Sequence, residues 1–423
     1  MKKYFMSVAA LAGMMSLAAC SSDDIVSPAD NDVQTIKIAV ASTGDKSTRS
    51  RDLNSEEPDQ KIESVAVVIR DKATNTVVYQ TIINGWNTKS NIYTDNGHGR
   101  EYTLKLEKDQ RLNAGDYTIT AVGYTAGDFK SNTIVDATKG KVAAGNFTAE
   151  EADGKAAQEA FAGESSITLL EDHEGINPSV TLHRQVAGYY GYFTSIPVKV
   201  DNKDVAYVRL VARSKNTKLT YGNFNSDFTT TNDKIMYVVN GSEPATTKDA
   251  KFKGSADNDA YTVYNIKVDE WFTQGDTNND GILDEKDEGW KNPLTAKGYK
   301  TYQPGTIFAG GFAVPFAATA DATLELQLLD VSGEILKSWT VAMATAQPAG
   351  KGVDGVSLTV PETVQNFSFF RNHMYTLGKK VDNTNDKPGT TTPDEPEPLD
   401  KSQSMILRVN DNWEVINRMT IGD

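Results

Sequence analysis

The segment "DTNNDGILDEKD" (276–287) carries the residues best suited to binding a cation. It places carboxylate or amide oxygens at its positions 1, 3, 5, 9 and 12, and glycine at position 6, where a tight turn is needed. With a main-chain carbonyl at position 7, this oxygen set suits Ca²⁺ and comprises Asp276, Asn278, Asp280, Ile282, Asp284 and Asp287. A solvated turn is the alternative, and we favour a structural calcium clip on a surface loop.

No other group of residues in the sequence forms a catalytic pattern. The four histidines are scattered without metal-ligand spacing, which favours core or surface imidazoles (His98, His173, His183 and His373). Nucleophile-elbow, phosphate-loop and dinucleotide motifs are missing from the sequence. The aromatic run "GYYGYF" (188–193) could stack on sugars, but core packing is the more common use of such a run. We therefore expect a protein that is not an enzyme.

The N-terminus has the features of an export signal. Lys2 and Lys3 precede an apolar run from Tyr4 to Ala19, which is too short for a membrane span and is followed by Cys20. Cys20 is the only cysteine, so the chain has no internal disulfide. The stretch "LAAC" resembles the lipobox of bacterial lipoproteins, in which the cysteine is acylated. The resemblance implies an outer-membrane lipid anchor at Cys20.

Length and charge narrow the class of protein further. A chain of 423 residues is too long for one ordinary core, which favours two or three domains. The formal net charge of −14 argues against a nucleic-acid partner, because phosphate binding needs clustered cations.

Short segments of alternating apolar and polar residues predict an all-β fold. Residues 61–71 and 76–83 flank a polar turn and predict a hairpin, and a second hairpin is expected around "VSGE" (331–334). Only residues 148–163 have the Ala, Glu and Gln content typical of a helix. Many strands without intervening helices favour β-sandwiches over a parallel sheet.

The C-terminal region combines a linker with a further apolar segment. Residues 382–400 are rich in Pro, Thr and Asp, yet apolar alternation resumes at 404, with Met405, Leu407, Val409, Trp413 and Val415. This segment either packs on its own domain, as C-terminal strands usually do, or is free to leave it. The N-terminal alternation Ile36, Ile38 and Val40 has the same period and similar volume, so either segment could fill a similar groove.

Several motifs together resemble the Bacteroidales fimbrillins, the FimA/Mfa type of type V pilus subunits. The resemblance is carried by the lipobox at Cys20, by the order of segments, and by "LNAGDYTITAVGY" (112–124), "VTLHRQVAGYY" (180–190) and "FFRNHMYTLG" (369–378). It implies a surface lipoprotein precursor with two transthyretin-like β-sandwich domains in tandem and a detached C-terminal donor strand.

The resemblance also implies a route of maturation. An arginine-specific protease would cut after Arg49 or Arg51 in "STRSRD" (47–52) and release the lipidated segment with its first strand. The vacated groove would then accept residues 404–417 of another subunit. An open groove with unpaired backbone groups is a physical template for strand addition, independent of any family.

We expect six segments along the chain: a signal peptide (1–19), a propeptide with the removable strand (20–51), two sandwich domains (52–177 and 178–381), the linker (382–400) and the donor segment (401–423). The function expected is that of a structural fimbrial subunit at the cell surface, with other subunits as partners. Alternatives are a tip adhesin of the same family or a permanently anchored glycan-binding lipoprotein. A secreted hydrolase ranks below both.

Overall fold

The computed structural model describes residues 33–40, 62–92, 100–124, 147–150, 159–170, 178–221, 239–294, 302–317, 324–343, 369–378, 396–400 and 405–410. In these ranges the fold is all-β, as predicted, with one short helix, α2 (Trp86–Lys89), and two 3₁₀ turns, Lys108–Gln110 and Val268–Glu270. No helix in the described part of the chain is long and apolar enough to cross a membrane.

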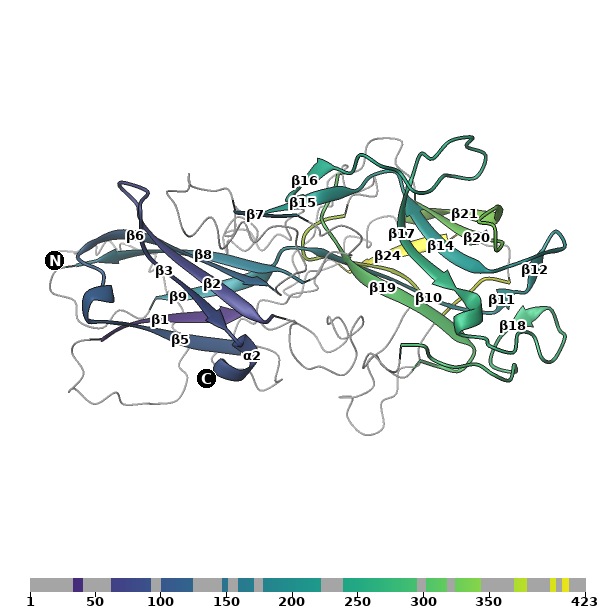
Figure 1. The fold of residues 1–423 in the computed structure, drawn as a ribbon, viewed down its shortest axis with the longest axis horizontal. Helices are drawn as coiled ribbons and strands as arrows, with labels where there is room; N and C mark the ends of the chain where they lie inside the picture. Colours follow the sequence, from purple (N-terminus) through teal and green to yellow (C-terminus); the bar gives the residue numbers. More distant parts are fainter. Residues whose placement is uncertain are drawn as a thin grey trace, which may run out of the picture.

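The N-terminal half forms one sheet, which we call the N-terminal sheet, in the order β3-β2-β6-β8-β9-β1-β5-β4 (Figure 1). Its strands are β1 (Val33–Val40), β2 (Ser64–Asp71), β3 (Val77–Asn84), β4 (Asn91–Ile92), β5 (Arg100–Glu107), β6 (Gly115–Tyr124), β8 (Phe161–Leu169) and β9 (Ser179–Arg184). The hairpin expected from residues 61–83 is confirmed, because β2 and β3 pair antiparallel from Ser64 with Asn84 to Arg70 with Val77.

The N-terminal sheet folds back on itself around an apolar core. The pairing of β8 with β9 covers only Phe161 with Arg184 and Ala162 with His183, so the sheet turns at this corner. One layer then contributes Val65, Val67 and Ile119, and the facing layer contributes strands β9, β1 and β5. The alternation read from the sequence produces this core, since every second side chain of a strand points to the same face.

The second half forms the C-terminal sheet in the order β17-β14-β20-β21-β24-β22-β10-β19, with β23 beside β10. Its strands are β10 (Ala187–Thr194), β14 (Tyr207–Ala212), β17 (Tyr261–Lys267), β19 (Thr306–Ala313), β20 (Leu324–Leu329), β21 (Ile335–Met343), β22 (Met374–Leu377), β23 (Glu397–Pro398) and β24 (Met405–Asn410). The β20–β21 pairing confirms the hairpin expected around "VSGE". The aromatic run 188–193 is core: Tyr189, Tyr190, Tyr192 and Phe193 are buried.

Smaller elements complete the fold. Two short pairs lie at the edge of the C-terminal half: β11 (Ile196–Pro197) with β18 (Ile282–Leu283), and β12 (Lys199–Val200) with β13 (Lys203–Asp204). A three-stranded sheet joins β7 (Phe147–Glu150), which precedes β8 in the chain, to β15 (Asn216–Tyr221) and β16 (Gly241–Pro244). One apolar cluster also spans both halves, from Val68 and Val122 to Tyr189. The two halves are therefore in contact along more than the covalent chain.

Three features differ from the sequence predictions. The helix predicted over 148–163 is not seen at either end: β7 includes residues 148–150 and β8 starts at Phe161, because pairing with β15 and β6 overrides a weak helix propensity. The chain passes between the two sheets at residues 185–186, so β9 belongs to the N-terminal sheet, although residue 178 was predicted to start the second domain. The division into domains stays a prediction. The third difference is β24, which is paired rather than detached.

Candidate functional site

Strand β1 fills an interior position of the N-terminal sheet, which we call the β1 slot. All of β1 pairs antiparallel with β5, and residues 37–40 also pair parallel with β9. Ile36 and Ile38 are 2% and 0% exposed, and the walls of the core around them include Leu104, Leu106 and Leu182. Removing β1 would leave free edges on both β5 and β9 and an open apolar trench between them.

Polar contacts fix the register of β1. The side-chain amide of Gln34 donates to the carbonyl of Leu112 (2.9 Å) and accepts from the Leu112 N–H (2.8 Å). Lys37 lies on the opposite face from the isoleucines, with its ammonium 3.0 Å from the carboxylate of Glu101. A one-residue slip would place Lys37 in the core, so burial and hydrogen bonding select the same alignment.

Cys20, Arg49 and Arg51 lie outside the described residues, so lipidation and cleavage stay predictions. Chain connectivity still bears on both. Residues 41–61 are the covalent link between β1 and the rest of the described chain, and both arginines lie in that link. A cut after Arg49 or Arg51 would leave β1 held only by non-covalent contacts.

Strand β24, which contains Met405, Leu407 and Val409, lies in its own chain. Residues 405–407 pair parallel with β21, and residues 408–410 pair antiparallel with β22. We call this position the β24 slot. The structure therefore has the arrangement in which the last strand packs on its own sheet, and a donor role requires β24 to leave. The proposed donor residues Trp413 and Val415 lie outside the described residues.

The end of the predicted linker is anchored rather than free. Glu397 and Pro398 pair parallel with Phe193 and Thr194 of β10, and the next N–H, of Leu399, donates to the Thr194 carbonyl at 3.0 Å. Leu399 is 0% exposed in the core of the C-terminal half. A donor arm that leaves the β24 slot therefore begins after Leu399.

A buried polar junction lies where the chain passes between the two sheets, and the sequence did not predict it. Arg371 donates to the side-chain carbonyl of Gln185 at 3.0 Å, and both residues are almost fully buried. Beside them, burial lowers the pKa of His373 to about 4, although its hydrogen bond with the Arg371 carbonyl (2.7 Å) acts in the opposite direction. The sequence signal that indicates this junction is the polar pair Arg184 and Gln185, which precedes the apolar and aromatic residues of "HRQVAGYY" (183–190).

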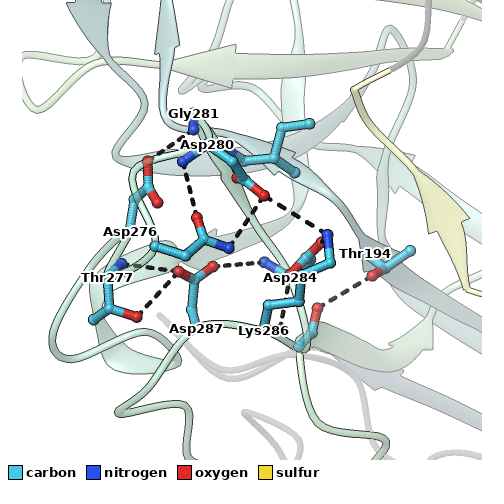
Figure 2. A network of polar contacts seen from close by, with 11 residues as sticks. Thr194, Asp276, Thr277, Asp280, Gly281, Asp284, Lys286 and Asp287 are labelled. Carbon is cyan, nitrogen blue, oxygen red and sulfur yellow. Dashed lines mark hydrogen bonds and ion pairs between the residues drawn. The ribbon is translucent and has the colours of Figure 1, made fainter.

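The acidic loop is held together by its own backbone and one lysine (Figure 2). One carboxylate oxygen of Asp276 accepts from the Gly281 N–H at 2.9 Å, and Asp287 accepts from the backbone of Thr277 and Asp284. Positive φ at Gly281 (85°) allows the turn expected at position 6. The short Asp side chains thus act as turn-forming acceptors.

A lysine lies among the proposed calcium ligands. The Lys286 ammonium is 3.0 Å from Asp284 and 3.7 Å from Asp280, and its hydrogen bond to Asp284 is the main cause of its raised pKa (Figure 2). The second oxygen of Asp276 is buried and accepts no hydrogen bond. Over the described ranges, no group of three or more His, Cys, Asp or Glu side chains is placed to hold a metal ion. Calcium binding by the loop stays a prediction.

The structure describes two of the four histidines. His373 is buried at the polar junction and His183 is partly buried on β9, whereas His98 and His173 lie outside the described residues.

Comparisons with known proteins give structural neighbours only. No family model matches the sequence, and no curated protein matches it. The fold is similar to a fimbrial assembly protein from Parabacteroides distasonis, at 12% identity and a TM-score of 0.36, over 83% of this chain and 93% of that chain. It is also similar to the C-terminally truncated tip fimbrial protein Mfa3 from Porphyromonas gingivalis, at 9% identity and a TM-score of 0.34, over 83% and 96% of the two chains.

Proposed function

We propose that this protein is a structural subunit of a surface fimbria, assembled by exchange of β-strands between subunits. The observation that carries the proposal is the β1 slot: an interior strand whose covalent link to the rest of the described chain, residues 41–61, contains two arginines. Cutting the link converts β1 from part of the chain into a replaceable ligand. A second strand, β24, has the pairing mode needed to replace it.

The energetics support replacement rather than simple loss of β1. Ile36 and Ile38 are almost fully buried, and each contributes about 1.5–3 kcal/mol relative to exposure. An empty slot would lose this burial and leave the backbone groups of β5 and β9 facing water. A donated strand such as 405–410, with apolar residues at alternate positions, would restore both kinds of contact.

Export and anchoring form the first stage of the proposal. Acylation at Cys20 would hold the precursor at the outer membrane while β1 keeps its own slot filled. An arginine-specific protease would then release the subunit and open the slot. Cys20→Ala should yield a precursor that no longer incorporates a labelled fatty acid, and unchanged incorporation would contradict lipidation at this residue.

The test of assembly uses the purified precursor, an arginine-specific protease and an unboiled denaturing gel. We expect a ladder of polymers after cleavage of the wild type. The double variant Arg49→Ala, Arg51→Ala should stay monomeric, and a chain truncated after Asp400 should be cut without forming a ladder. Cleaved wild type that stays monomeric would contradict strand exchange.

One observation favours a second candidate function, that of a permanently anchored surface lipoprotein, because β24 is paired within its own chain. Such a protein would keep β1 covalently attached and would not polymerise. A tip adhesin differs again, since it would accept a donor strand without donating its own. The cleaved wild type by itself separates a shaft subunit from both alternatives, because a ladder forms only if each subunit accepts one strand and donates another.

We also propose that the loop 276–287 binds Ca²⁺, supported by the oxygen spacing and by the buried, unpartnered oxygen of Asp276. Lys286 would have to move away from Asp280 and Asp284. Ca²⁺ at 100 times its dissociation constant should stabilise the fold by about 2.7 kcal/mol, and Asp276→Asn should remove most of that effect. An unchanged melting temperature with and without Ca²⁺ would contradict the proposal.

A further inference from the structure

The two slots share one short stretch of the molecule. Strand β9, the parallel neighbour of β1, ends at Arg184. Strand β22, the antiparallel neighbour of β24, begins at Met374. Residues 185–188, which follow β9, form hydrogen bonds at the polar junction with residues 371–373, which precede β22. The path from slot to slot is therefore β9, residues 185–186, the turn 371–373, and β22.

Three hydrogen bonds join the two sides of this junction. The Arg371 guanidinium donates to the Gln185 side chain (3.0 Å), the Asn372 N–H donates to the Val186 carbonyl (3.0 Å), and the Gly188 N–H donates to the His373 carbonyl (2.9 Å). Asn372 adopts a left-handed conformation, with φ of 61°, to make the turn. The turn therefore has one specific shape that depends on its partners in 185–188.

Gln185 is fixed from the other direction by the N-terminal sheet. Its N–H donates to the Ala160 carbonyl at 2.7 Å, next to β8, and its side-chain amide donates to the His183 carbonyl at 2.9 Å. Arg184, beside it, forms a fully buried ion pair with Glu159 at 2.8 Å. Buried polar groups of this kind either keep their partners or lose several interactions together, so the junction has few intermediate arrangements.

Loss of β1 acts directly on this end of the path. With β1 in place, residues 179–182 of β9 pair with it, and Lys37 N–H donates to the Pro178 carbonyl (2.9 Å). Without β1, the strand pairing that the described residues leave to β9 is the two-residue corner with β8, at His183 and Arg184. The strand that positions Gln185 would then be free to shift.

From these contacts we propose that the junction couples the two slots, so that β24 is held in its own chain while the β1 slot is filled and is released more readily when that slot is empty. The coupling rests on the proposed strand-exchange function and supplies its regulation. Gln185 and Arg371 act as positioning residues, because they lie between the strands that border the two slots and belong to neither β1 nor β24. By linkage, refilling the β1 slot must strengthen the hold on β24 by the same factor.

The test measures hydrogen exchange of the backbone amides of residues 405–410 in protein immobilised at low density, where subunits cannot meet. We compare the uncut chain with the cleaved chain washed free of its N-terminal fragment, as confirmed by mass. Exchange should rise about tenfold on removal of β1, within the 5- to 150-fold range typical of coupled sites. Adding a synthetic peptide of residues 33–40 should reverse the rise.

Two variants locate the coupling. In the uncut chain, Gln185→Ala should already give fast exchange at 405–410, and its response to the loss of β1 should be small. Arg371→Lys, which cannot keep the same geometry, serves the same purpose should Gln185→Ala fail to fold. Ser255→Ala is the matched control, because it removes a partly buried hydrogen bond to the Asp259 carboxylate (2.9 Å) in the segment between β16 and β17, and it should keep the full response.

The two possible failures are distinguishable. Equal exchange at 405–410 before and after the loss of β1 overturns the coupling, even where a polymer ladder forms and the proposed function stands. A response of wild-type size in both junction variants also overturns it. A rise in exchange without any ladder from the same protein in solution supports the coupling and contradicts the fimbrial function.

Discussion

Strands β1 and β24 occupy comparable positions in the two halves of the molecule, yet they are held to different extents. Each lies between one parallel and one antiparallel neighbour. All of β1 pairs with β5 and its second half also pairs with β9. Within the described part of the chain, each half of β24 pairs on one side.

This difference in pairing predicts that β1 resists exchange and that β24 leaves its sheet more easily. A strand paired along its full length and packed through Ile36 and Ile38 does not exchange readily while it is covalently attached. The proposed exchange of β1 would therefore need proteolysis to start it. A strand paired on one side at each point loses fewer hydrogen bonds on leaving. By this pairing, β24, the proposed donor, is held more weakly than β1, the strand that it would replace.

The largest effect is expected from breaking the hold on β1. Ile38→Asp places an unpaired carboxylate at a fully buried position and should reduce the free energy of unfolding by about 4–5 kcal/mol. Urea unfolding followed by circular dichroism measures it. Lys37→Glu, on the opposite face, should cost less than about 1 kcal/mol. Similar losses for the two variants would contradict the burial pattern of β1.

A substitution at Leu399 tests whether residues 397–399 anchor the segment that precedes β24. Leu399→Ala removes a fully buried side chain and should destabilise the C-terminal half by about 2–5 kcal/mol. Residue-resolved hydrogen exchange should show the loss around β10 before it appears around β5. A loss of protection confined to the N-terminal sheet would contradict the packing of Leu399 in the C-terminal half.

Acid should lower the stability of the C-terminal half, because the buried His373 lies next to β22. Its folded pKa of about 4 is below the unfolded value of about 6.5, so the unfolded chain binds the proton first. Stability is full above pH 6.5 and is lost as the pH falls toward 4, by roughly 3 kcal/mol. His373→Gln should flatten this part of the pH–stability curve, and an unchanged curve would exclude His373 as its source.

The smallest effect is expected at Gln34, whose amide makes two hydrogen bonds to the backbone of Leu112. Gln34→Ala should destabilise the uncut protein by about 1–2 kcal/mol and speed the loss of β1 after cleavage. The dissociation rate of the fragment, followed by mass spectrometry, measures the second effect. A dissociation rate equal to that of the wild type would show that Gln34 does not help to hold β1.

Local patterns predicted the strands well and their partners poorly. Alternation located β2 and β3, and turn residues located two hairpins, since both depend on neighbouring residues. The parallel pairing of β1 with β9 joins residues 37–40 to 179–182, and no local signal specifies that register. The helix predicted over 148–163 is wrong at its first residues, because β7 gains its partner from β15, far along the chain.

The candidate site was predicted unevenly for the same physical reason. Met405, Leu407 and Val409 were identified as a strand, but alternation is identical for a strand that stays in its chain and one that leaves it. In the sequence, Gln185 and Arg371 stand out only as members of the motifs 180–190 and 369–378. Their hydrogen bond spans 186 residues of sequence, so it becomes visible only once both sheets are built.

The most direct test of strand exchange is to locate residues 405–410 in polymers grown from two isotopically distinct batches of the protein. A photo-reactive label attached through Lys105→Cys, an exposed position on β5 beside the β1 slot, reports which chain fills that slot. We expect cross-links from residue 105 to the C-terminal segment of the other isotopic batch. Polymers whose label reaches only β1 or other residues of the same chain would contradict the account.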